Sequence, residues 1–148
     1  GFNYRLPNIS AAMGYAQLEN INEIFSQKER IYKRYKEKLK NIDGLNIPKI
    51  EEYNSNFIMW VFNLYLDDKF KISRDELTKA LRENNIETRD AFVPINKQKP
   101  IQTLFNIEED SCPNANYVME NGMYLPSGNN ILDDEIDYVC EKIIETNK

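Results

Sequence analysis

The chain has 148 residues, of which 41% are hydrophobic and 29% charged, and its formal net charge is −5. A chain of this length and composition is typical of one globular domain, and its negative charge disfavours nucleic acid as the main partner. Its longest apolar run, residues 57–66, is too short to span a bilayer, so no membrane partner is expected.

Histidine is absent from the sequence, and there are two cysteines, Cys112 and Cys140. The lack of imidazole excludes Ser–His and Cys–His catalysis within this chain. The cysteine spacing fits no metal motif, so we expect no metal site. Reduced thiols in a cytoplasmic protein are the expected state of both cysteines.

Residues 8–41 predict one long helix. Asn8 is expected to cap its N-terminus, and Asp43–Gly44 to end it. Small residues dominate the first turns, where another helix could approach closely. An apolar stripe at three- and four-residue spacing predicts a core or interface face, made of Leu18, Ile21, Phe25, Tyr32, Tyr35, Leu39 and Ile42.

Residues 57–66 are rich in aromatic and branched side chains, and apolar residues occupy both faces of a strand formed there. This pattern predicts a central strand covered on both faces, with Trp60 and Phe62 on one of them. Ser73 and Glu76 form a capping-box pattern that predicts a helix to about Asn84. Residues 86–90 are expected to form a second strand, followed by a loop over residues 91–100.

The last third of the chain predicts short elements. Residues 101–112 look irregular, with one helical turn near Thr103. Pro113 and Gly122 bracket a short helix, and residues 123–126 form a strand. A final helix begins near Asp133, with a buried stripe of Ile136, Val139, Cys140 and Ile143.

Together these elements predict an α+β fold, with a small, largely antiparallel sheet packed with helices. We treat residues 1–148 as a single domain, made of the long helix 8–41 and an α/β part over residues 45–148.

Four blocks, in this order, carry a family resemblance. Residues 1–19 resemble a GxNxR-L motif followed by a small-residue helix. Residues 74–77 and 85–89 resemble RDEL followed by GIETR. Residues 92–95 resemble an FxP loop, and residues 124–128 with 132–139 resemble a closing LP and TDEEIDYV block. The chain thus resembles the DegT/DnrJ/StrS sugar aminotransferases, which use pyridoxal phosphate (PLP).

The resemblance implies the C-terminal domain of a type I PLP aminotransferase that acts as a homodimer. Such an enzyme moves an amino group from L-glutamate to a nucleotide-linked keto-sugar. The chain looks most like the perosamine-synthetase branch, which aminates the 4-keto carbon for cell-surface polysaccharides. In the family, the cofactor lysine and most phosphate ligands lie upstream of these blocks. No catalytic residue is therefore expected here, and the chain alone should be inactive.

For the first block, the resemblance implies that Asn3 reaches the PLP phosphate of the neighbouring subunit. An amide N–H can bond a phosphate oxygen without adding charge. The alternative is that Asn3 shapes the turn before the helix. Arg5 could meet an anion of the substrate or form a structural salt bridge. Tyr4 could line the sugar pocket or pack in the dimer interface.

Arg89 lies at a predicted strand end before a proline-containing loop, where binding residues often occur. It could bind the diphosphate of the sugar nucleotide or the carboxylate of the amino donor. The alternative is an exposed ion pair with Glu87 or Asp90. Phe92 could stack on the sugar or base, or pack in the core. Asn96 stands where many relatives carry histidine, and it could bind the substrate only through hydrogen bonds.

A second hypothesis needs no catalysis. The long helix, with its Tyr and Leu stripe, could pair with a helix of another protein and make the chain a non-catalytic interaction module.

Overall fold

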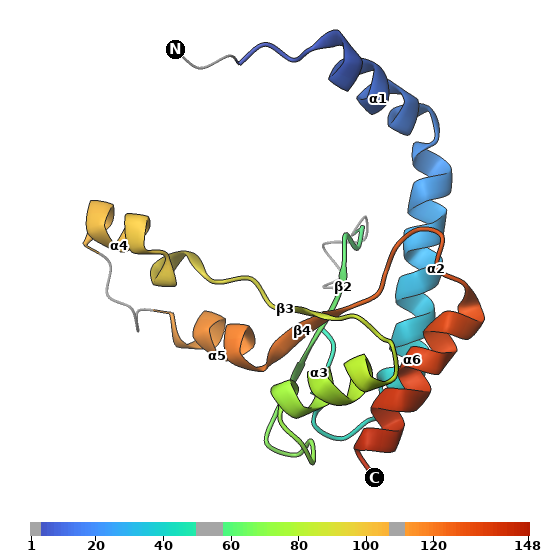
Figure 1. Ribbon diagram of the computed structural model, residues 1–148, viewed down its shortest axis with the longest axis vertical. Coiled ribbons are helices and arrows are strands. Elements are labelled where there is room, and N and C mark those ends of the chain that lie inside the picture. Colours follow the sequence, from blue (N-terminus) through green and yellow to red (C-terminus); the bar gives the residue numbers. More distant parts are fainter. Residues whose placement is uncertain (1–3, 50–57, 107–111) are drawn as a thin grey trace.

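The computed structural model describes residues 4–49, 58–106 and 112–148. Its described residues form a four-stranded antiparallel sheet surrounded by helices (Figure 1), which confirms the predicted α+β class. The strands lie in the order β1 (Leu45–Asn46), β2 (Phe62–Leu66), β4 (Gly122–Leu125) and β3 (Arg89–Asp90). β2 and β4 are therefore the two central strands, and their register pairs Phe62 with Leu125.

One face of the sheet is covered by helices. α2 (Ile21–Leu39) packs along α6 (Asp133–Thr146), and α3 (Arg74–Glu83) packs against α6. Tyr35 of α2 is fully buried and stacks on Phe62 with ring centroids 4.6 Å apart. The predicted stripe of α6 is confirmed, because all four of its residues are buried with the inward residues of β2 and β4, namely Ile136, Val139, Cys140, Ile143, Phe62, Leu64, Leu66, Met123 and Leu125.

The opposite face of the sheet is only partly covered. α5 (Pro113–Asn121) lies against β2 and β4, where Tyr117 meets Tyr65 edge to face. Asn63 of β2 is exposed and Tyr65 is half-buried. The expectation of a strand buried on both faces is therefore wrong.

The predicted strand over residues 57–66 is also too long. β2 begins at Phe62, and the side chains of Ile58 and Trp60 are exposed rather than buried in the core. The partner strand β4 ends at Leu125 and is followed by Pro126. Phe57 lies outside the described residues.

The N-terminal helix is two helices rather than one. α1 (Asn8–Glu19) ends at Asn20, whose φ of −102° and ψ of 13° leave the helical region, and α2 begins at Ile21. The Asn20 amide donates to the Ala16 carbonyl oxygen at 3.0 Å, an alternative to the helical ladder. Asn8 does not cap α1, because Pro7 occupies the capping position without a side-chain bond.

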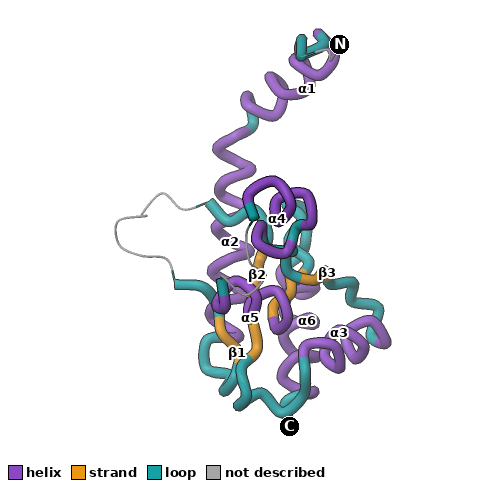
Figure 2. The backbone as a smooth tube through the Cα atoms, turned by 90° about the vertical axis from the view of Figure 1, so that its left-hand side faces the viewer, coloured by secondary structure: helices purple, strands orange, loops and turns teal. Residues whose placement is uncertain are grey.

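α1 has no buried residue and projects from the body of the molecule (Figure 2). Consequently only the C-terminal half of the predicted apolar stripe reaches the core: Tyr35 and Leu39 are buried, whereas Leu18 and Phe25 are exposed.

An ionic ladder joins α2 to α6. Arg34 donates from Nε and Nη2 to the two carboxylate oxygens of Asp137, each at 2.8 Å, and Lys38 lies 2.9 Å from Asp137. Arg30 pairs with Asp133 one turn away. Hydrogen bonds from Arg34 and Lys38 lower the pKa of Asp137 to about 2.

The remaining predictions hold in part. The capping box of α3 is confirmed, with Ser73 Oγ accepting from the Glu76 N–H at 3.3 Å. β3 is shorter than the predicted strand over residues 86–90. The expected loop contains a 3₁₀ turn, η2 (Ile95–Lys97), and the helical turn near Thr103 is the helix α4 (Lys99–Phe105). No helix among the described residues is long and apolar enough to cross a bilayer.

Candidate functional site

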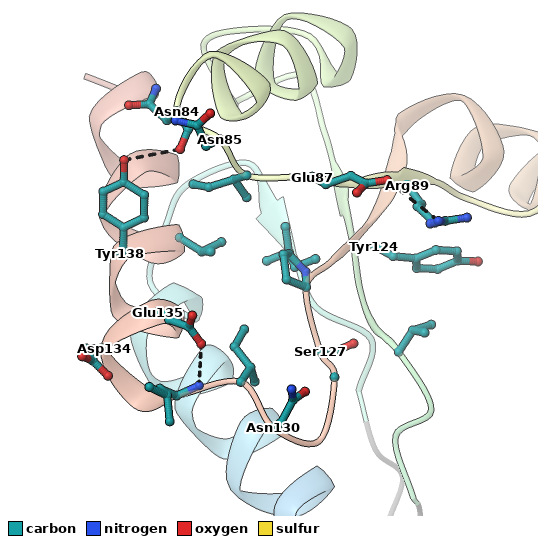
Figure 3. Close-up of a pocket in the computed structure, with 18 residues that line it drawn as sticks. Asn84, Asn85, Glu87, Arg89, Tyr124, Ser127, Asn130, Asp134, Glu135 and Tyr138 are labelled. Atoms are coloured by element: carbon teal, nitrogen blue, oxygen red, sulfur yellow. Dashed lines mark hydrogen bonds and ion pairs between the residues drawn. The ribbon is translucent and has the colours of Figure 1, made fainter.

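A pocket of 1100 Å³ opens where β3 and β4 separate. Figure 3 shows the residues that line it converging from the α3–β3 connection, from β4 and the loop that follows it, and from the first turns of α6. Its floor is apolar and includes Ile86, Leu125 and Val139, which are buried. Its rim carries amide, hydroxyl and charged groups, so the pocket suits a polar ligand with an apolar portion.

The pocket exists because the predicted second strand pairs over two residues only. Arg89 faces Tyr124 and Asp90 faces Met123, but the residues before Arg89 leave the ladder. Ile86 instead turns down into the core, and its N–H bonds the Leu81 carbonyl oxygen at 2.9 Å. The wedge left between the two chain segments is the pocket.

Arg89 stands at the edge of this pocket, and its side chain is 81% exposed. Arg89 Nη2 lies 3.8 Å from Oε1 of Glu87, whose side chain is similarly exposed. The neighbouring Asp90 is paired with Arg74. Of the two ion pairs expected for Arg89, the structure therefore shows the one with Glu87. An exposed ion pair at this distance is weak. An anionic ligand can therefore replace Glu87 as the partner of the Arg89 guanidinium with little loss of free energy.

Three aromatic rings form a cluster beside Arg89. Trp60 and Phe92 stack with ring centroids 5.8 Å apart and planes 13° apart, and Phe92 meets Tyr124 at 5.2 Å. The Phe92 N–H donates to the Tyr124 hydroxyl oxygen at 3.2 Å. Trp60 is 69% exposed and Phe92 64% exposed, so the expectation of a core position holds for neither ring. We call these three residues the aromatic cluster.

A second pocket of 560 Å³ lies on the partly covered face of the sheet. Phe92 and Tyr124 line it together with residues of β2 and α5, and Tyr124 also lines the larger pocket. Tyr124 thus joins the aromatic cluster to both pockets, whereas Phe92 lines only the smaller one and Trp60 stacks on Phe92 outside both linings. The exposed ring faces are accessible to a flat ligand.

Asn96 lies away from both pockets in η2 and is only 4% exposed. Its side-chain NH₂ group donates to Asn116 Oδ1 of α5 at 2.9 Å, and its main-chain carbonyl oxygen accepts from the Gln102 side chain at 2.7 Å. These contacts join η2, α4 and α5. A substrate-binding role for Asn96 stays a prediction.

The structure does not bring the first block together with Arg89. Tyr4 and Arg5 are exposed and precede α1, at the end of the projecting arm, whereas Arg89 lies in the body (Figure 1). Asn3, the expected PLP contact, lies outside the described residues. Within one chain, therefore, the predicted site residues occupy two separate places.

A profile of the DegT/DnrJ/EryC1/StrS aminotransferase family matches residues 1–144. The chain belongs to this family. Among its relatives, GDP-perosamine synthase of Vibrio cholerae is 33% identical over 143 residues, which are 96% of this chain and 38% of that protein. The chain thus spans little more than a third of the length of such curated relatives.

Solved structures with the same fold include DesV of S. venezuelae, at a TM-score of 0.86 and 21% identity, covering 100% of this chain and 38% of that one. They also include an E. coli GDP-4-keto-6-deoxy-D-mannose-3-dehydratase with bound hydrated PLP, at a TM-score of 0.80 and 24% identity. That match covers 97% of this chain and 36% of the dehydratase. These likenesses show that the fold is that of the aminotransferase family.

Sequence reasoning missed two members of the aromatic cluster. It placed Trp60 among core residues of a strand, because its apolar neighbours continue the β2 pattern. The sequence places Tyr124 in the last predicted strand and in the closing LP block, but its position beside Arg89 depends on the register of β3 on β4.

Proposed function

We propose that the chain is the C-terminal part of a PLP-dependent aminotransferase that moves an amino group from L-glutamate to a nucleotide-linked keto-sugar. The observation that carries the proposal is the family match over residues 1–144, which covers all four sequence blocks. The similarity to GDP-perosamine synthase supports a perosamine-type reaction on a sugar for polysaccharides. We further propose that the enzyme is a cytoplasmic homodimer and that the 148-residue chain alone is inactive.

PLP, when bound, supplies the electron sink of the reaction. We propose that Asn3 contacts its phosphate across the subunit interface. The arm that carries Asn3 supports this placement: α1 has no buried residue, and Tyr4 is 90% exposed beside it. The described residues next to Asn3 are thus accessible to a group held by the second subunit. We place Tyr4 and Arg5 at the same interface, where Tyr4 borders the sugar and Arg5 an anionic group.

Arg89 is the proposed anion-binding residue of the substrate site. Its guanidinium matches the geometry of a diphosphate, and its only neighbouring carboxylate in the described ion pairs, Glu87, is exposed and 3.8 Å away. The aromatic cluster offers stacking faces for the base or sugar, with Phe92 central to it. Asn96 would act on the same substrate through the loop that it joins to α4 and α5.

The proposal is tested with the full-length polypeptide that contains this chain. Adding L-glutamate to its PLP form should shift the cofactor absorbance to that of pyridoxamine phosphate, and a nucleotide-linked 4-keto-sugar should reverse the shift. The 148-residue chain with added PLP should show neither change. No shift with glutamate in the full-length protein would contradict the proposal and favour an interaction module that uses the exposed α1.

A further inference from the structure

Lys28 on α2 reaches two chain segments that are far apart in the sequence. Its ammonium group donates to the carbonyl oxygen of Trp60 and to that of Ser127, each at 2.8 Å. Ser127 is buried and lines the larger pocket. Val61, which follows Trp60 in the chain, also lines this pocket. One cation thus joins two walls of the pocket.

The place of this contact follows from the register of the sheet. β2 and β4 end at the pair Phe62 and Leu125, and the same register continued by two residues sets Trp60 opposite Ser127. The cation bridges the carbonyl oxygens of the next facing pair, so it replaces the missing ladder bonds with charge-assisted ones.

A second contact closes the same junction. The Phe62 N–H donates to Ser127 Oγ at 3.2 Å. No ladder bond holds Trp60 itself, because it precedes β2, and its ring is largely exposed. The Trp60 backbone is therefore held by the hydrogen bond from Lys28 of α2, and the Trp60 ring stacks on Phe92.

α2 supplies further donors to the same loop. The Tyr35 hydroxyl donates to the Pro126 carbonyl oxygen at 2.8 Å, and Arg30 donates to the Ile131 carbonyl oxygen at 2.6 Å. Neither of these hydrogen bonds reaches the segment that carries Trp60. Lys28 differs from them because it also holds the segment that carries Trp60. Partial burial lowers its pKa, in agreement with an ammonium group drawn out of water.

We propose that Lys28 is a positioning residue, which fixes the spacing between Trp60 and Ser127 and thereby the orientation of the aromatic cluster at the pocket. Lys28 itself lines neither pocket. It acts through the two carbonyl oxygens that it holds. The effect on substrate binding rests on the proposed function, whereas the effect on the two segments does not.

The test uses the full-length polypeptide with Lys28→Met, which keeps the aliphatic stem and removes the donors. Lys28→Arg, which keeps donors, is the rescue variant. Lys33→Met is the matched control, because Lys33 lies on the same helix and, within the part of the chain that the structure describes, forms its ion pair with exposed Glu29. Hydrogen–deuterium exchange is followed in peptides covering residues 58–62 and 126–130, and KM is measured for the nucleotide sugar and for glutamate.

Lys28→Met should speed exchange in both peptides and raise the KM for the nucleotide sugar by roughly three- to tenfold, as expected for the loss of hydrogen bonds to a charged group. The KM for glutamate should not change, and Lys28→Arg should restore much of the loss. Unchanged exchange would overturn the proposal, as would faster exchange with an unchanged KM for the nucleotide sugar. If the protein proved not to be an aminotransferase, the exchange result would still decide whether Lys28 holds the two segments.

Discussion

The rings of Trp60 and Phe92 stack nearly in parallel, 5.8 Å apart, although both rings are largely exposed to solvent. Burial, rather than stacking, gives most of the stabilisation of an aromatic ring. Core packing therefore does not explain a stacked pair that stays exposed to solvent. Phe92 of this pair meets Tyr124, which lines the larger pocket together with Arg89. Flat apolar faces beside a cation suit a ligand that has a flat ring and an anionic group, as we propose for the nucleotide-linked substrate.

Phe92→Ala should weaken binding of the nucleotide sugar with little effect on folding. Loss of an aromatic stacking partner is worth about 1 kcal/mol, so we expect KM to rise by about fivefold. Steady-state kinetics of the full-length protein measure this effect. Phe105→Ala is the control, because Phe105 of α4 is similarly exposed but lines neither described pocket. Equal effects of the two variants would argue against a substrate role for the aromatic cluster.

The sequence predicted those parts of the fold that depend on local signals. The capping box at Ser73, the proline and glycine that bracket α5 and the buried stripe of α6 all arise from short-range patterns, and all are present. It failed where a tertiary partner decides the outcome. The apolar run before Phe62 reads as strand, yet β2 begins only where β4 can pair with it.

The ionic contacts of Asp137 should make stability depend on pH. The pKa of Asp137 is about 2 in the folded protein against 3.8 as its ordinary value, because Arg34 and Lys38 donate to its carboxylate. The contacts therefore stabilise the fold above about pH 4, and this contribution is lost as the pH falls toward 2.

Asp137→Asn should lower the melting temperature at pH 7, and the difference from the unsubstituted protein should shrink between pH 4 and pH 2. Half-exposed pairs contribute little, so the loss should be about 1 kcal/mol. Glu29→Gln, which breaks the more exposed pair with Lys33, is the control and should have a much smaller effect. A stability difference for Asp137→Asn that stays constant across this pH range would contradict the assignment.

Removal of the α3 cap should destabilise the protein. In Ser73→Ala the Glu76 N–H loses its acceptor, which costs about 1 kcal/mol. For a protein of this size the melting temperature should fall by about 3 °C. Ser26→Ala in the exposed middle of α2 serves as the comparison and should leave the melting temperature unchanged or slightly raised. A neutral Ser73→Ala would show that the cap contributes nothing measurable.

Gly44 should tolerate no side chain. Its φ is +78°, and a Cβ there would lie 2.0 Å from the backbone nitrogen of Phe70. Gly44→Ala should therefore cost at least about 2 kcal/mol, through strain and displacement of the turn before β1. Gly14→Ala is the contrasting variant: its Cβ would meet nothing within 4 Å, and alanine favours the helix α1. Similar melting temperatures for the two variants would contradict this account.

The candidate site was predictable only in part. Arg89 and Phe92 were found because they flank a strand end and a proline-containing loop. Trp60 and Lys28 were not, since their roles depend on where β2 and β4 stop pairing. Lys28, Trp60 and the Arg89–Phe92 segment come from three separate parts of the sequence, so only the tertiary structure places them together.

Binding of the nucleotide sugar to full-length protein carrying Arg89→Met tests the central claim most directly. Calorimetry should show a Kd at least about tenfold higher than that of the unsubstituted protein, from the loss of a charge-assisted contact with the diphosphate. The glutamate-driven change in cofactor absorbance should proceed as before. An unchanged Kd, with the same cofactor response, would contradict the assignment of Arg89 and the pocket beside it to the substrate.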